Sequence, residues 1–77
     1  FEAALSHHLE SIDLLDKIGA RCDLAEAYFQ LGLTYQAMSE IEQSLKCRDR
    51  AIQLFTAIEA PKQVDRVIKA FEQGAKQ

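Results

Sequence analysis

The feature that most constrains the fold of this chain is a similarity of the sequence to itself at a displacement of forty residues. The displacement brings apolar residues onto apolar residues and small residues onto small ones. A fixed period of this length is typical of stacked structural repeats, in which each unit is too small to bury its own apolar face. The identical pairs are Glu2/Glu42, Leu5/Leu45, Ile12/Ile52, Leu14/Leu54, Ile18/Ile58 and Ala20/Ala60.

Apolar residues recur every three or four positions along the chain, and the alternation typical of strands is absent. This spacing places them on one face of a helix, so the sequence predicts four helices. We expect them at residues 1–18, 21–37 and 40–58, with the fourth beginning at Pro61. Proline is well accommodated at a first helical position, and Gly19 suits the left-handed conformation that ends a helix. A tight turn is expected at Met38-Ser39.

Two further details of these helices are predicted. Asp23 with Glu26, and Ser39 with Glu42, have the spacing of capping boxes, in which two side chains bond to free amides at the start of a helix. Gly32 lies in the middle of the second helix, where glycine costs about 1 kcal/mol relative to alanine. We expect it there because another helix approaches closely; a merely tolerated glycine is the alternative. The second helix is also apolar on more than one side.

Length and charge limit the class of protein. A chain of 77 residues forms one small domain at most, and its core is marginal unless neighbours extend it. Residues 1–45 carry eight acidic and two basic residues, whereas residues 46–77 carry four acidic and seven basic ones. The net charge of −3 argues against a nucleic-acid partner.

Cysteine usage and hydropathy favour a cytoplasmic protein. Two cysteines without a CxxC pair fit a reducing compartment better than a disulfide framework. No apolar run approaches the roughly 18 residues of a membrane span, so no membrane partner is expected. The sequence opens inside a helical pattern without a signal peptide, and we expect it to be a piece of a longer protein.

The central segment carries a large residue, a leucine, a glycine and a tyrosine at fixed spacing, then small residues and a proline: Tyr28, Leu31, Gly32, Tyr35, Ser44, Ala51 and Pro61. This pattern resembles the tetratricopeptide repeat. The resemblance implies an all-α fold of antiparallel helical hairpins, about four helices in all, stacked as a right-handed solenoid. Residues 1–77 would form one domain, with 1–20 the second half of one repeat, 21–60 a full repeat and 61–77 the first half of the next.

The chain departs from the family pattern in two ways. Its period is forty residues, where roughly thirty-four is usual. Glu72 and Ala75 stand where glycine and tyrosine are expected in the fourth helix.

The resemblance also implies a binding surface. The first helix of each pair, here the second and the fourth helices, would line a concave face. Family members that clamp a terminal carboxylate use lysine and asparagine at the positions of Phe29 and Leu33, so no such clamp is expected. A groove with an apolar floor and a basic edge of Lys62, Arg66 and Lys69 is expected instead; for these bases a solvated face is the alternative. By resemblance, the residues facing a partner are Glu26, Phe29, Gln30, Leu33, Gln36, Arg66, Lys69 and Gln73.

No residue cluster argues for catalysis, a metal or a cofactor. His7-His8 with Cys47 is the one candidate metal cluster, but adjacent histidines point about 100° apart on a helix and no fourth ligand is evident. No glycine-rich phosphate loop is present, and no strand–turn setting exposes a nucleophile. The sequence therefore predicts no enzyme, but a protein-interaction scaffold that binds a protein or a peptide.

The alternative function is a structural or self-association segment of a multidomain signalling protein or transcriptional regulator. Both ends of the chain are half repeats, and each is expected to leave an apolar stripe uncovered. We therefore expect the isolated chain to associate with itself.

Overall fold

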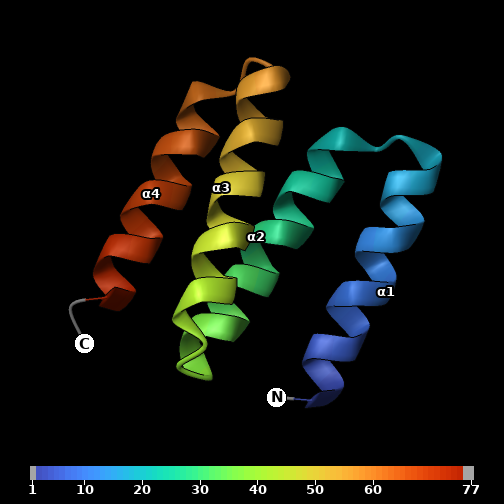
Figure 1. Ribbon diagram of the computed structural model, residues 1–77. Coiled ribbons are helices and arrows are strands. Elements are labelled where there is room, and N and C mark those ends of the chain that lie inside the picture. The colour runs from blue at the N-terminus through green and yellow to red at the C-terminus, as the bar shows by residue number, and fades with distance from the viewer. Residues whose placement is uncertain (1, 76–77) are drawn as a thin grey trace.

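The computed structural model describes residues 2–75, with side chains placed as far as residue 73. Four helices follow one another: α1 (Glu2–Ile18), α2 (Arg21–Ala37), α3 (Ile41–Ala57) and α4 (Pro61–Ala75). Consecutive helices run antiparallel, and no strand occurs within the described residues (Figure 1). The expected all-α class is confirmed; α2 has its predicted bounds, and α3 is one residue shorter at each end. The prediction that the first helix includes Phe1 lies outside the described residues.

The helices form a row in which α2 holds the central place. It packs against α1 and α3 and also touches α4, whereas α1 contacts α2 alone among the described helices. Leu24 and Leu31 are buried on one side of α2, and Ala25, Phe29 and Gly32 are buried about 100° further round the helix. The expectation that this helix is apolar on more than one side is therefore confirmed.

The same turn joins the helices three times. Gly19, Ser39 and Glu59 have positive φ angles of 74°, 63° and 58°. After each of them, a backbone amide bonds to the carbonyl five residues earlier, which is the Schellman arrangement of a helix end. These bonds are Ala20 N–H to Leu15 O at 3.1 Å, Glu40 N–H to Tyr35 O at 2.9 Å and Ala60 N–H to Phe55 O at 2.9 Å. Each helix with its turn therefore occupies twenty residues, and two such units make the forty-residue period.

The predicted capping boxes are wrong. Ala20 and Glu40 precede α2 and α3, and neither makes a side-chain hydrogen bond to the helix that follows. Ser39 cannot cap α3 because it already ends α2 in the left-handed conformation. Asp23 lies inside α2, whose first residue is Arg21.

Replacing Ser39 by glycine is expected to raise the free energy of unfolding by about 0.5–1 kcal/mol. The left-handed conformation costs a residue with a Cβ atom roughly 1–2 kcal/mol, and glycine avoids this cost. The greater conformational freedom of glycine in the unfolded chain offsets part of the stabilisation. Glu59→Gly should raise the free energy of unfolding by a similar amount. Urea unfolding measures both, with Gln53→Gly, at an exposed position inside α3, as a control expected to lose about 1 kcal/mol. A loss of stability in Ser39→Gly would contradict this account of the turn.

The core lies among α2, α3 and α4. It consists of small and aromatic residues, Ala25, Phe29, Ala51, Phe55, Val67 and Phe71. Gly32 lies at its edge, where a Cβ atom would stand 2.6 Å from Cζ of Phe71 and 3.2 Å from Cβ of Cys47. The expected close approach of another helix to Gly32 is confirmed, and it involves both α3 and α4.

A polar contact joins α1 to α2. The Thr34 hydroxyl donates its one hydrogen to the carbonyl of Gln30, at 3.1 Å. The same hydroxyl lies 3.2 Å from Nε2 of His8, within hydrogen-bond distance. His8 thus has a structural role between the two helices.

Candidate interaction surfaces

The predicted partner-binding residues lie mainly where α2 meets α4. Glu26 and Arg66 form an ion pair between the two helices. The Arg66 guanidinium also lies over the ring of Phe29, 4.9 Å from its centroid. The Phe29 ring in turn packs at an angle of 50° against Phe71, with 6.0 Å between the centroids. These contacts fasten α2 to α4.

Phe29 is not exposed, and the expectation that it forms the open floor of a groove is wrong. Its side chain is 5% exposed and belongs to the core. Arg66 covers it from the solvent side, and Phe71 approaches it from α4. Sequence spacing places Phe29 on a second apolar side of α2, but only the packing of α4 shows that this side is covered.

The other predicted residues are distributed around this contact. Gln36 donates from Nε2 to the carbonyl of Phe71 at 3.2 Å, and Gln30 donates to Glu26 at 3.5 Å. Leu33 is half-buried and Gln73 is exposed.

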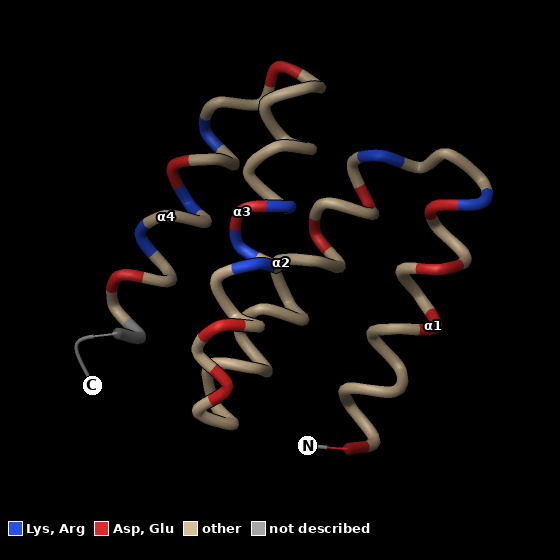
Figure 2. The backbone as a smooth tube through the Cα atoms, viewed as in Figure 1, with Lys and Arg blue, Asp and Glu red and all other residues tan. Residues whose placement is uncertain are grey.

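The basic edge is largely neutralised. Lys69 pairs with Asp65 at 3.0 Å, as Arg66 does with Glu26. Both of these pairs are well exposed, so each contributes at most about 1 kcal/mol. Acidic residues are spread along α1, whereas basic ones gather on α3 and α4 (Figure 2).

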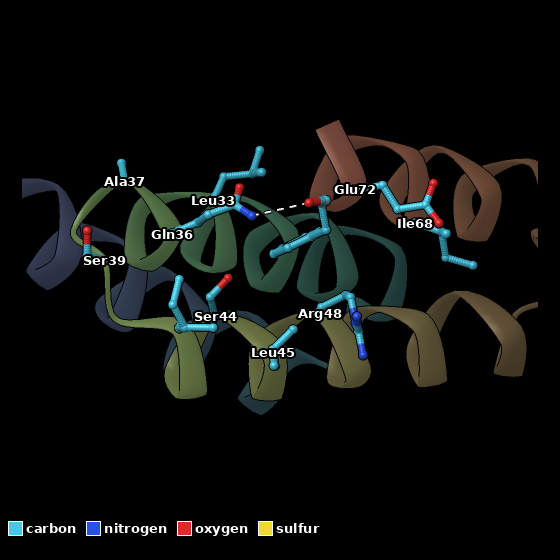
Figure 3. Close-up of a pocket in the computed structure, with 11 residues that line it drawn as sticks. Leu33, Gln36, Ala37, Ser39, Ser44, Leu45, Arg48, Ile68 and Glu72 are labelled. Carbon is cyan, nitrogen blue, oxygen red and sulfur yellow. Dashed lines mark hydrogen bonds between the residues drawn. The ribbon is translucent and has the colours of Figure 1, made fainter. Parts of the chain in front are cut away.

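An open cleft of about 790 Å³ lies between the first half of α3 and the second half of α4, with α2 behind it (Figure 3). Two large apolar side chains of its α3 wall, Ile41 and Leu45, are 54% and 41% exposed. Exposed apolar residues that share a concave surface are typical of binding sites. The lining residues are Leu33, Gln36, Ala37, Ser39, Ile41, Ser44, Leu45, Arg48, Ile68, Phe71 and Glu72.

Leu33 and Gln36 are the two predicted partner-binding residues that line this cleft. Sequence reasoning missed Ile41, Leu45 and Ile68. The forty-residue repeat contained one signal for a cleft at this place. The position that corresponds to Tyr35 of the preceding unit holds the smaller Ala75. The sequence thus has a small residue in the fourth helix where the preceding unit has a large one.

Polar groups surround the mouth of the cleft. Arg48 lines it and pairs with its neighbour Asp49 at 2.9 Å, and Glu72 lines the opposite wall. Ser44 is buried at the base. The cleft thus combines an apolar interior with one basic and one acidic group at its rim.

The structure does not bring together the candidate metal cluster. Cys47 is buried on α3 beside Gly32, whereas His7 is exposed on α1, which does not contact α3. Within residues 2–75, no group of three or more His, Cys, Asp and Glu side chains is placed to hold a metal ion. Burial also raises the pKa of the Cys47 thiol, so less of it is thiolate at neutral pH.

None of the helices in the described part of the chain has the length and apolar character needed to cross a membrane. A scan against protein-family models finds no match, and searches among curated proteins and solved structures find none either.

Proposed function

We propose that this chain is a protein-interaction module of the tetratricopeptide-repeat type, acting in the cytoplasm as part of a larger protein. Its antiparallel helices, the identical turns every twenty residues and the contact between α2 and α4 support a solenoid arrangement. The observation that carries the interaction function is the α3–α4 cleft, with Ile41 and Leu45 exposed in its wall.

The proposed ligand is a peptide segment that presents a large apolar or aromatic side chain. On α2, Tyr35 shares a helix side with Leu24 and Leu31, which are buried but do not belong to the α2–α3–α4 core cluster. At the corresponding position forty residues on, the sequence has the smaller Ala75. A ring supplied by the ligand would take the place that Tyr35 holds one repeat earlier, and charged residues beside it would meet Arg48 and Glu72.

Peptide display against the chain tests this function, with Leu45→Glu as the discriminating variant. Peptides selected on the unaltered chain should share a large apolar or aromatic anchor and bind Leu45→Glu at least about tenfold more weakly. Burial of one leucine-sized side chain contributes about 1.5–3 kcal/mol, and a charge in the apolar wall adds to the loss.

Gln43→Glu is the matched control because it adds the same charge at an exposed position of α3 outside the cleft. Binding of the selected peptides should be nearly unchanged in this variant. Peptides without a common anchor, or equal binding to Leu45→Glu and the unaltered chain, would refute the proposed site.

The alternative, a structural or self-association segment, draws its support from α1, where Leu14 and Ile18 are exposed. Sedimentation at micromolar concentrations separates the two functions. Self-association gives a mass that rises with concentration and falls in Leu14→Glu, whereas the interaction module stays monomeric.

A further inference from the structure

One face of α1 is apolar and uncovered. No residue of α1 is buried, although α2, α3 and α4 each contribute buried side chains. Leu14 and Ile18 are 60% and 66% exposed, and they lie one helical turn apart. Because α1 contacts α2 alone, this face has no partner among the described helices.

The internal repeat shows what kind of surface this face is. It belongs to a strip that also includes Ala4, His7 and Ser11 and corresponds, forty residues on, to Ser44, Cys47, Ala51, Leu54 and Ile58. In α3 the corresponding strip packs against α2. Cys47 adjoins Gly32, and Ala51 shares a cluster with Ala25 and Phe29. The strip on α1 keeps nearly the same order of side-chain sizes and lacks only the covering helix.

The opposite end of the row is different. The residues of α2 that cover α3 and α4 include Ala25, Phe29, Gly32 and Leu33, and their counterparts on α4 are Asp65, Lys69, Glu72 and Gln73. All four counterparts are exposed, and Lys69 pairs with Asp65. The expected apolar stripe along α4 is therefore wrong, since this face is polar like that of a capping element. Head-to-tail stacking of two copies would set these polar groups against Leu14 and Ile18 of α1, so a second copy is a poor occupant.

The charge of α1 indicates which residues a helix covering this face would carry. On α3, Arg50 lies 5.9 Å from the centroid of the Tyr28 ring of α2. The corresponding residue of α1 is Glu10, on a helix with four acidic residues and one basic residue (Figure 2). A helix that covers α1 would therefore gain from a basic residue where α2 has Tyr28.

We propose that the uncovered face of α1 binds an amphipathic helix with the packing pattern of α2. That helix carries small residues at the positions of Ala25 and Gly32, an aromatic residue at that of Phe29, and lysine or arginine at that of Tyr28, facing Glu10. The surface is separate from the α3–α4 cleft and shares no residue with it.

A graft of the chain's own helix tests this proposal. A copy of residues 21–40, with lysine at the position of Tyr28, is attached directly before residue 1, so that the forty-residue register continues. The melting temperature should rise by at least about 5 °C, because the graft buries the face of α1. A control graft that carries serine at the position of Phe29 should raise the melting temperature much less.

Leu14→Glu reports whether the graft covers the intended face. In the ungrafted chain Leu14 is exposed, so the variant should lower the melting temperature by no more than about 3 °C. In the grafted chain the same change should lower it by at least about 8 °C, because the charge becomes buried. Equal effects of Leu14→Glu in both chains would overturn the proposal.

Two further measurements test the role of the Glu10 charge and whether a second copy of the chain covers the face of α1. Glu10→Gln should reduce the effect of the graft at low salt, and Asp16→Asn, which removes an exposed charge about 120° further round α1, should not. If both changes reduced the stabilisation by the graft equally, the grafted lysine would not be paired with Glu10. An ungrafted chain that sediments as a dimer, and that Leu14→Glu dissociates, would assign the face to a second copy and overturn the proposal.

Discussion

Replacing Phe29 by alanine is expected to lower the free energy of unfolding by about 3–5 kcal/mol. The ring is almost wholly buried and packs against Phe71, so its removal leaves a cavity among α2, α3 and α4. A domain of this size has a total stability of only about 4–12 kcal/mol, so the loss is a quarter of that stability or more. Urea unfolding followed by circular dichroism measures the change.

The control for Phe29→Ala is Leu14→Ala, which also truncates a large apolar side chain but at an exposed position. It should change the stability by no more than about 0.5 kcal/mol. If Phe29→Ala were as mild as this control, Phe29 would be a surface residue, and its assignment to the core would fail. The comparison therefore decides between a groove floor and a core residue directly.

Replacing Gly32 by leucine is expected to lower the free energy of unfolding by about 1–3 kcal/mol. The first added atom already stands too close to the Phe71 ring and tight against Cβ of Cys47, so the Phe71 ring must shift or the neighbouring helices must move away from α2. Higher helix propensity offsets only about 1 kcal/mol of this. An unchanged or higher melting temperature would refute the close-packing role of Gly32.

A double-mutant cycle separates the Phe71 contact from the rest. Gly32→Ala adds only the Cβ atom, and Phe71→Leu removes the ring atoms that this Cβ would meet. Gly32→Ala should therefore be more favourable in the Phe71→Leu chain than in the unaltered one. Equal effects of Gly32→Ala in the two chains would mean that the neighbouring Cys47 alone sets the limit.

The sequence by itself determined the local structure of this protein. The three-and-four spacing of apolar residues predicted the bounds of α2 and, to within one residue, those of α3. The forty-residue period follows from two helix-and-turn units, and Pro61 and Gly19 have the positions expected of them. Gly32 was also correctly interpreted, because a glycine inside a helix needs a reason in packing. These features depend on residues close to one another in the chain.

Only the tertiary structure decided which faces are covered. Ser39 could be assigned to the end of α2 instead of the start of α3 only when both neighbouring backbones were in place. Phe29 is a core residue because α4 brings Phe71 and Arg66 to it. Ile41 and Leu45 form the wall of a cleft because little of α4 covers them. A helical pattern states which side of a helix is apolar, but burial depends on contacts between helices distant in sequence, and these a local pattern does not contain.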